Sequence, residues 1–576
     1  MFYRKIGRLF SNIWGVHTNK NKYLHINFNF RNSNDYNNKN YKNYHKYLWS
    51  FATLGYITLY YNSRKNLYVF AKEESTETKP TSGCASDNPP EPIQPHLKAP
   101  KIPQRPDLPT YSQKDLLKHR CRGEGVWVTY QNGVYDITEF LDKHPGGDQI
   151  TLASGKAVEG FFNYSVLHYA PHVLKLMEKY RIGNLRPQDV RTEFRRRNVF
   201  AHEPTDRDPN LIPLSKEPFN AGPSESLLYA HPITPNAYHF VRTHGPVPEI
   251  PDLKNYTVEI AIEGQKKSLM LTLDDLKKFP KYSVNATIMC AGNRRDDMMM
   301  AKPDKGLRWT LVATGNSIWS GARLRDILAK AGLTKKDEEN LHHVQFDGWD
   351  TDFREEYFSM SIPLWKAVDE RGDVLIAYEM NGAPIPVDHG FPVRAIVPGF
   401  AGARSVKWLQ KVIVQKEECQ TFNHQRLYKS FSPNVSYENL DWNLSPPVDE
   451  LPVISAICEP VNGGTANVSN GKINVKGYAF SGGGQKILRV DVSSDQGVTW
   501  HTAEFTYQDP IKPPRHYSWS LWCCDVPVPK GKNCEIWVKA VDSFNNTQPE
   551  KFEHIWNLRG VICNAYHKIK VNLVSC

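Results

Sequence analysis

The sequence contains few cysteines and no long hydrophobic run, and each of these two features excludes certain classes of protein. Ten cysteines in 576 residues include no CxxC pair, which argues against a disulfide scaffold and against a zinc knuckle. No stretch of 18 or more residues is free of charged side chains, so a protein with several membrane spans is not expected. With 40% hydrophobic residues, the chain is able to form roughly three to five domain cores.

Acidic residues are almost absent from the first 70 residues. This segment carries eleven Lys and Arg against one acid, Asp35, and so holds +10 of the total net charge of +11. Near its C-terminal end lies an uncharged run of 17 residues at 47–63, between Lys46 and Arg64. A basic, acid-poor start followed by an apolar run predicts an organelle presequence with a hydrophobic sorting segment. The alternative is a disordered tail with a short interfacial helix.

Changes in composition divide the rest of the chain. Pro-rich and charged stretches predict a linker over residues 71–108 and a hinge linker over 187–225. Between them lies a compact segment, 109–186, and a large mixed region follows over 226–447. Short β-rich runs separated by Gly- and Asn-containing turns predict an antiparallel β-sandwich over 448–576. The predicted fold class is therefore multidomain α+β.

Two histidines 24 residues apart mark the compact segment. A hairpin is predicted from strands 126–130 and 134–138, and His144 follows it at the start of a His-Pro-Gly-Gly turn, with His168 downstream. Two neutral imidazoles on opposite walls of an apolar pocket are able to ligate a haem iron axially, which leaves no site for oxygen. His172 competes with His168 as the second ligand. Across 109–186 the segment resembles the cytochrome b5 family, which implies a b-type haem held by His144 and His168.

A cysteine among cationic residues marks the large mixed region. Cys290 precedes Arg294 and Arg295, and clusters of Arg, His and Lys with glycines occur at 240–248, 388–394 and 402–408. A thiolate is a soft metal ligand, and such cationic clusters suit an anionic cofactor with a phosphate. Taken singly, the cysteine is more typical of a buried structural residue and each cluster of a solvated basic face.

Together these motifs resemble the molybdopterin domain of the sulfite oxidase family and of its relative, plant-type nitrate reductase. An N-terminal haem segment without a flavin or nicotinamide domain is similar to the animal-type sulfite oxidases. The resemblance implies that Cys290 binds molybdenum. It implies a pterin site formed by Phe240, Val241, Arg242, Thr243, His244, Asp350, His389, Arg394, Ser405, Val406 and Lys407. It also implies a substrate pocket of Arg242, Arg295, Trp309, Tyr428 and Arg559, supported by Lys305.

The resemblance further implies the reaction and the partners. Sulfite would be oxidised to sulfate, the final step of sulfur amino-acid catabolism, and electrons would pass through the haem to cytochrome c. The protein would be a homodimer joined through the sandwich, located in the mitochondrial intermembrane space, with no stable membrane span in its mature form and no nucleic-acid partner. Three alternatives remain open: a reductase of nitrate or another oxyanion, an electron carrier with an inactive molybdenum domain, and a secreted protein, which sequons such as Asn434-Val435-Ser436 permit. The Cys523-Cys524 pair has no functional interpretation.

Overall fold

The computed structural model describes the chain from residue 102 onward with short gaps. The described residues are 102–144, 150–151, 153–162, 168, 171–190, 199–303, 306–352, 356–436, 439–529 and 531–575. The predicted presequence, its hydrophobic run at 47–63 and most of the linker 71–108 lie outside these residues, and so does Lys305.

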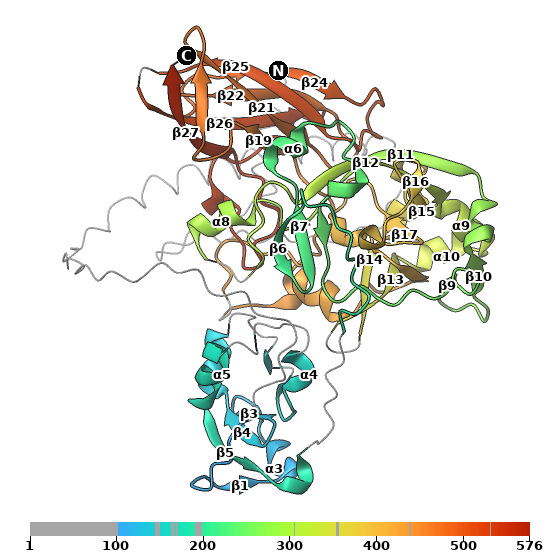
Figure 1. Cartoon of the computed structure of the whole chain (residues 1–576). Helices are drawn as coiled ribbons and strands as arrows, with labels where there is room; N and C mark the ends of the chain where they lie inside the picture. Colours follow the sequence, from blue (N-terminus) through green and yellow to red (C-terminus); the bar gives the residue numbers. More distant parts are fainter. Residues whose placement is uncertain are drawn as a thin grey trace, which may run out of the picture. The chain divides into compact units, whose positions relative to one another are not determined.

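The compact segment forms a five-stranded sheet with short helices (Figure 1). The strand order is β1-β5-β4-β3-β2, with β1 (Thr110–Tyr111), β2 (Arg120–Cys121), β3 (Gly125–Tyr130), β4 (Gly133–Asp136) and β5 (Arg181–Leu185). Its helices are α3 (Gln113–Leu116), the 3-10 helix η1 (Thr138–Lys143), α4 (Glu159–Phe162) and α5 (Pro171–Glu178).

The predicted hairpin is present, with one difference at its end. Strands β3 and β4 pair around a turn in which Gln131 has a left-handed φ of 52°. The second strand stops at Asp136, whose carboxylate accepts a hydrogen bond from the Thr138 backbone N–H at 3.0 Å. The Thr138 hydroxyl in turn accepts from the Val126 N–H at 2.8 Å. These local side-chain bonds replace sheet pairing and start helix η1, because Asp and Thr side chains compete with the backbone ladder.

The mixed region contains three sheets. A five-stranded sheet has the order β10-β9-β18-β13-β14, with β9 (Thr257–Ile262), β10 (Leu269–Thr272), β13 (His343–Thr351), β14 (Tyr357–Pro363) and β18 (Leu409–Gln415). A second has the order β11-β12-β15-β16, with β11 (Lys281–Met289), β12 (Thr314–Arg323), β15 (Leu375–Met380) and β16 (Ala383–Pro384), and β17 (Arg394–Ile396) also pairs with β15. The third is formed by β6 (Ile212–Lys216), β7 (Phe219–Gly222) and β8 (Val241–Arg242).

The helices of the mixed region are short and lie between these strands. They are α6 (Glu225–Tyr229), α7 (Leu273–Lys277), α8 (Arg295–Ala301), α9 (Leu324–Lys330), α10 (Lys335–Asn340) and α11 (Leu364–Val368). Buried side chains alternate with less buried ones along β13, the period-two pattern of a strand with one face in a core. One hydrophobic core runs from the sheets of this region into the first strands of the C-terminal region.

The second half of the predicted hinge 187–225 is folded, which corrects its assignment as a linker. Strands β6 and β7 lie within it, and β7 pairs with β8. Upstream of them, Arg207 forms ion pairs with Glu203 and with Asp388, the latter at 2.8 Å. The polar, Pro-rich composition is typical of a linker, so the sequence predicted one. In the structure, charged residues of this stretch such as Arg207 form ion pairs with residues far away in the sequence.

The C-terminal region is the predicted β-sandwich (orange to red in Figure 1). One sheet has the order β19-β21-β25-β24 and the other β20-β27-β26-β22-β23. The strands are β19 (Ile454–Glu459), β20 (Thr465–Val468), β21 (Lys472–Phe480), β22 (Ile487–Ser493), β23 (His501–Thr502), β24 (Glu504–Gln508), β25 (Ser520–Pro527), β26 (Asn533–Asp542) and β27 (His567–Ser575). A separate hydrophobic core that includes Val475, Trp522 and Val538 lies in this region.

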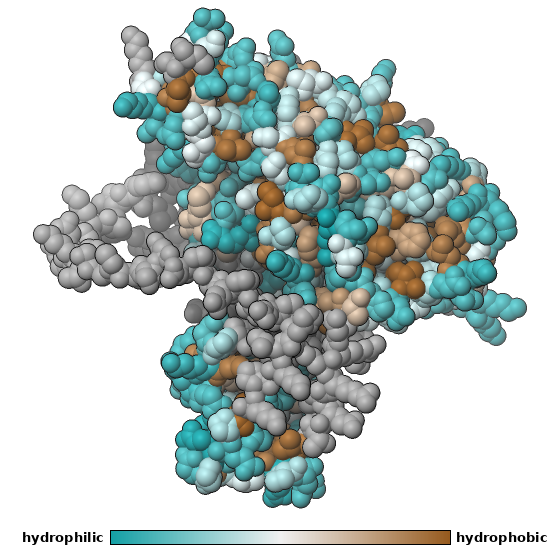
Figure 2. All heavy atoms as spheres, in the orientation of Figure 1, coloured by the Kyte–Doolittle hydropathy of each residue, from teal (hydrophilic) through white to brown (hydrophobic). Residues whose placement is uncertain are grey.

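The surface carries no large apolar area on the face shown in Figure 2. Hydrophobic residues there lie in small separate patches among hydrophilic ones. Within the part of the chain that the structure describes, no helix has both the length and the apolar character that crossing a bilayer requires.

Candidate functional site

The structure brings together the two histidines predicted to bind haem. The ring centres of His144 and His168 are 6.1 Å apart and their planes differ by only 8°. This spacing leaves room for one metal ion between two imidazole nitrogens, each about 2 Å from it. Phe162 stacks on His168 with 4.7 Å between ring centres. The competing histidine, His172, lies exposed on α5.

A cavity in the mixed region collects most of the other predicted residues. It encloses about 640 Å³ of space, open solvent at its mouth included. The predicted residues that line it are Phe240, Arg242, Thr243, His244, Cys290, Asp350, His389, Arg394, Ser405, Val406, Lys407 and Tyr428. Val241 is buried beside them in β8 without lining the cavity.

Arg242 and Thr243 are held by a residue that sequence reasoning missed. The Asn220 side-chain oxygen accepts hydrogen bonds from Arg242 Nη1 at 3.1 Å and from the Thr243 N–H at 3.0 Å. Asn220 lies on β7, inside the stretch assigned to the hinge. Only the pairing of β7 with β8 shows that it supports the cavity.

Cys290 follows β11 at the point where this strand reaches the cavity. Its backbone N–H donates to Ala313 O at 2.9 Å, and its sulfur accepts a hydrogen bond from the Gly292 N–H at 3.4 Å. The residue is buried but lines the cavity. A sulfur held in this way is placed to bind a soft metal ion inside the cavity.

The cavity wall has an excess of buried positive charge. Arg394 donates to His389 O at 2.8 Å and to Ser405 O at 2.6 Å, and Lys407 donates to Asp388 O at 2.9 Å. Burial lowers the pKa of Arg394 to about 9 and also lowers the pKa of Lys407. Both shifts arise because burial removes water from these cations, so an anion in the cavity would stabilise their charged forms.

Several buried polar atoms of the wall have no partner among the described residues. They are His239 Nε2, Thr243 Oγ1 and Asp350 Oδ1. Burial also raises the pKa of Asp350, although Lys407 opposes this shift. An unpaired buried polar atom is costly, and a pterin with its phosphate would supply both donors and acceptors. The wall therefore fits an anionic metal–pterin group, with the Cys290 sulfur available for the metal. His239 directly precedes the cationic cluster at 240–248, and this position was the signal in the sequence that could have indicated its place in the wall.

Tyr428 and His244 form a hydrogen bond at the cavity. The Tyr428 hydroxyl lies 2.7 Å from His244 Nε2. Burial raises the pKa of the Tyr428 hydroxyl, and burial together with Arg242, Lys407 and Arg295 lowers the pKa of His244. The pair is therefore an uncharged phenol and an uncharged imidazole at neutral pH.

Three residues predicted for the substrate pocket lie outside the cavity lining. Arg295 donates to the carbonyl oxygens of Gly560 at 2.9 Å and Leu307 at 2.8 Å. Trp309 is fully buried and its ring meets Phe240 edge-on at 6.4 Å. Arg559 Nε is buried and has no partner within the described part of the chain.

Comparison with protein families assigns all three folded regions. Residues 112–186 match the cytochrome b5-like heme/steroid binding domain, 244–423 the oxidoreductase molybdopterin binding domain, and 445–574 the Mo-co oxidoreductase dimerisation domain. The matches confirm the predicted multidomain α+β organisation and its two cofactors, a molybdenum cofactor and a b-type haem.

Individual relatives extend over most of the chain. The mitochondrial sulfite oxidase of Drosophila melanogaster is 47% identical over 82% of this chain and 82% of its own length. The mitochondrial sulfite oxidase of Homo sapiens is 45% identical over 80% of this chain and 84% of its own. The crystal structure of the sulfane dehydrogenase SoxCD from Paracoccus pantotrophus shares the fold, with a TM-score of 0.50 and 24% identity over 61% of this chain and 83% of that one. The chain therefore belongs to the sulfite oxidase family of oxidoreductases.

Proposed function

We propose that this protein oxidises sulfite to sulfate. One sulfite and one water give one sulfate, two protons and two electrons. The observation that carries the proposal is the cavity in which the Cys290 sulfur and the Arg242 guanidinium meet an excess of buried positive charge. When bound, the molybdenum cofactor supplies oxygen transfer and takes up two electrons, and the b-type haem carries electrons singly.

The proposed cofactor roles follow the resemblance and the placement of the residues. Cys290 would bind molybdenum, and His144 and His168 would bind the haem iron. The pterin and its phosphate would be held by residues 240–244, Asp350, His389, Arg394 and residues 405–407. Support comes from the unpaired Thr243 and Asp350 oxygens and from the depressed pKa of Arg394.

The proposed substrate site binds a small oxyanion. The planar guanidinium of Arg242 is able to hold two sulfite oxygens through paired N–H groups and leave the sulfur lone pair free. The Tyr428 hydroxyl, held by His244, would donate to a third oxygen and keep its own proton because its pKa is raised. Arg295, Trp309, Arg559 and Lys305 are proposed to complete the pocket, and the unpaired Arg559 Nε supports this role.

The proposed partners and location extend the same assignment. Cytochrome c would accept the electrons from the haem, which would make this the final step of sulfur amino-acid catabolism. The match of residues 445–574 to a dimerisation domain supports a homodimer. The mitochondrial relatives and the basic, acid-poor first 70 residues support a mitochondrial location, specifically the intermembrane space.

The test is an absorption spectrum of the purified, oxidised holoprotein before and after sulfite is added without any other reductant. The expected result is reduction of the b-type Soret and α bands by sulfite, and its loss in Cys290→Ser. Reoxidation of the reduced protein by nitrate, with no response of the oxidised protein to sulfite, would overturn the proposal in favour of a nitrate reductase.

A further inference from the structure

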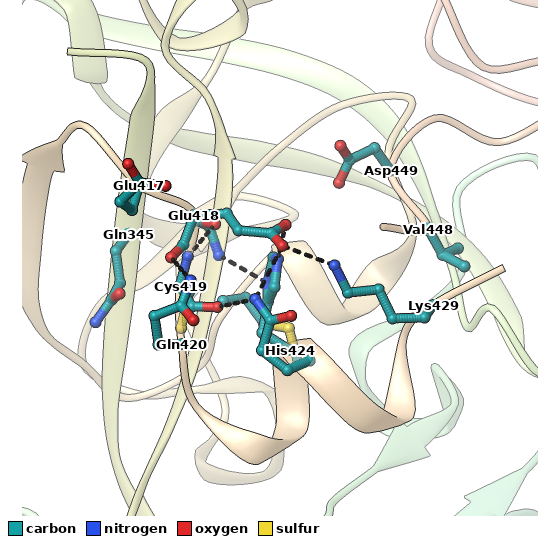
Figure 3. Close-up of polar contacts among 12 residues, drawn as sticks. Gln345, Glu417, Glu418, Cys419, Gln420, His424, Lys429, Val448 and Asp449 are labelled. Atoms are coloured by element: carbon teal, nitrogen blue, oxygen red, sulfur yellow. Dashed lines mark hydrogen bonds and ion pairs between the residues drawn. The ribbon is translucent and has the colours of Figure 1, made fainter. Parts of the chain in front are cut away.

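A largely buried ionic cluster lies beside the cavity. The proposed sulfite oxidation assigns no role to its side chains. It consists of Arg404, Glu418, His424 and Lys429. Figure 3 shows His424 and Lys429 both directed toward the Glu418 carboxylate. The distances are 3.0 Å from His424 Nε2 to Glu418 Oε2 and 2.7 Å from Lys429 Nζ to Glu418 Oε1. Arg404 is fully buried, and His424 and Lys429 are 1% and 3% exposed.

The hydrogen bonds fix the proton on the His424 ring. Arg404 Nη1 lies 2.6 Å from His424 Nδ1. A guanidinium only donates hydrogen bonds, so Nδ1 is an acceptor and carries no proton. The proton of the neutral ring is therefore on Nε2, which donates it to Glu418. The cluster forms a directed chain from Arg404 through His424 to Glu418.

The cluster joins two segments of the cavity wall. Arg404 lies between Ala403 and Ser405, which both line the cavity. His424 belongs to the π-helical turn η9 (Asn423–Leu427) that ends directly before Tyr428, and Lys429 follows that tyrosine. Glu418 thus binds the chain on both sides of Tyr428, with a further hydrogen bond from Gln425 Nε2 at 2.9 Å.

A second route connects Arg404 to the Tyr428 backbone. Arg404 donates to Val448 O from Nε at 3.1 Å and from Nη2 at 3.0 Å. The Val448 N–H donates to Tyr428 O at 2.9 Å. The main chain at Tyr428 is therefore held on one side through Val448 and on the other through the His424 turn.

Burying Arg404, His424 and Lys429 around a Glu418 carboxylate that is 25% exposed is an expensive way to stabilise a domain. Hydrophobic side chains of similar volume often stabilise an interior as well as a buried ion pair does. What the ionic cluster adds is direction, because its hydrogen bonds fix where each side chain lies and which ring nitrogen of His424 donates. The group whose position this direction controls is Tyr428, whose hydroxyl has to meet His244 at the substrate site.

We propose that Glu418 is a positioning residue for Tyr428, and that through His424 and Lys429 it sets the place of the tyrosine hydroxyl at the oxyanion site. The inference rests on the proposed function, since it assigns Glu418 a part in binding the sulfite and sulfate anions. The cluster is not in contact with the anion itself.

The experiment is a double-mutant cycle of Glu418→Gln and Tyr428→Phe in the holoprotein. Sulfate affinity of the oxidised protein is measured by calorimetry, and kcat and KM for sulfite are measured alongside it. In the wild-type background, Glu418→Gln should weaken sulfate binding and raise KM by about tenfold, as expected for coupled neighbours. In the Tyr428→Phe background, the same substitution should change either quantity by less than about twofold, because the hydroxyl to be placed is gone.

Two further substitutions separate positioning from general stability. His424→Gln keeps an acceptor for Arg404 and a donor for Glu418, so it should retain near wild-type sulfate affinity. His424→Leu keeps neither and should weaken sulfate binding as Glu418→Gln does. The matched control is Asp373→Asn, which removes the charge of another carboxylate in an ion pair, that of the buried Asp373 with the partly exposed Arg515. It should lower the unfolding temperature and leave sulfate affinity unchanged.

Additive effects of Glu418→Gln and Tyr428→Phe, or an unchanged sulfate affinity in His424→Leu, would overturn the inference. Both results presuppose a wild-type protein that oxidises sulfite. If the wild type does not, the proposed function itself is refuted, so the two failures are distinguishable.

Discussion

The charges of a few side chains in the cavity wall favour the binding of an anion. Arg242, Arg394 and Lys407 bring three cationic groups to one wall, and backbone carbonyls or an amide oxygen satisfy much of their hydrogen bonding without neutralising their charge. Lys407 binds the main-chain oxygen of Asp388, whose carboxylate is already paired with Arg207. The net positive charge of the wall is therefore available for a bound oxyanion or phosphate.

Replacement of Arg242 should weaken the substrate site specifically. Charge-assisted hydrogen bonds contribute about 1.5–3 kcal/mol, so Arg242→Met should lower kcat/KM for sulfite by roughly 10- to 100-fold. The matched control is Arg308→Met, because Arg308 is exposed and forms an ion pair with the partly exposed Asp296. Steady-state kinetics with a dye acceptor measure both variants. An equal loss in the two would show that Arg242 acts through overall charge and not through contact with the anion.

Removal of one proposed haem ligand should separate the two redox sites. His144→Ala should abolish the b-type Soret band and the reduction of cytochrome c, while sulfite oxidation with a small dye acceptor persists, since the cavity is built from other residues. His172→Ala is the control and should keep the spectrum, because His172 is exposed on α5. Loss of the haem band in His172→Ala, with retention in His144→Ala, would contradict the ligand assignment.

Among the elements, the turn from β11 to α8 depends most on distant parts of the chain. Arg294 adopts a left-handed φ of 60° at the start of α8, and its side chain is fully buried. It donates to Ser455 O at 3.2 Å and to Ala565 O at 2.8 Å, and it pairs with Asp297 at 2.8 Å. The C-terminal region therefore fixes the segment that carries Cys290 and Arg295.

Replacement of Arg294 should damage both stability and the cavity. Arg294→Met leaves buried carbonyl oxygens and the Asp297 carboxylate without their donor, which should cost about 3–5 kcal/mol. The expected results are a lower unfolding temperature and a reduced molybdenum content in the purified protein. Lys278→Met, which removes an exposed partner of the partly exposed Asp275, should change neither. A wild-type molybdenum content in Arg294→Met would show that the turn keeps its shape without this contact.

At the scale of the whole molecule, many histidines are buried in the uncharged form. Burial lowers the pKa of His239 and of His424 to about 4 and that of His567 to about 3. For His424 and His567, neighbouring Arg404 and Arg294 lower it further. These residues lie in the mixed region and in the sandwich, so their protonation opposes the folded state of both.

Stability should therefore fall as the pH falls from about 6.5 to 4. In this window the unfolded chain binds protons that the folded chain does not, so the free energy of unfolding decreases with decreasing pH. At about 1.4 kcal/mol per pKa unit, pKa values lowered by more than two units at three histidines predict a combined loss on the order of 10 kcal/mol by pH 4. Thermal unfolding at several pH values measures it. His567→Gln, which keeps an acceptor for the Ile457 N–H, should flatten the dependence, and a midpoint constant from pH 7 to 4.5 would contradict the explanation.

Local sequence patterns were sufficient to predict many of the strands and the chemical class of the two cofactors. The β-rich runs at 473–480, 487–494 and 534–542 predict strands, and the structure has β21, β22 and β26 there, each to within one residue. The His144 and Cys290 motifs pointed to a haem and to a metal–pterin group because each motif combines ligand type and backbone shape within a few residues. The folded half of the predicted hinge was missed because composition carries no information about pairing partners.

The sequence by itself determined much of the strand and turn pattern, the two cofactors and the family resemblance, since these depend on neighbouring residues. Only the tertiary structure decided that Asn220 supports Arg242, that Arg295 binds main-chain carbonyls of the C-terminal region, and that Arg404, Glu418, His424 and Lys429 meet beside Tyr428. The physical reason is that hydrogen bonds and ion pairs act over about 3 Å in space and do not depend on the 11 to 265 residues that separate such partners along the chain.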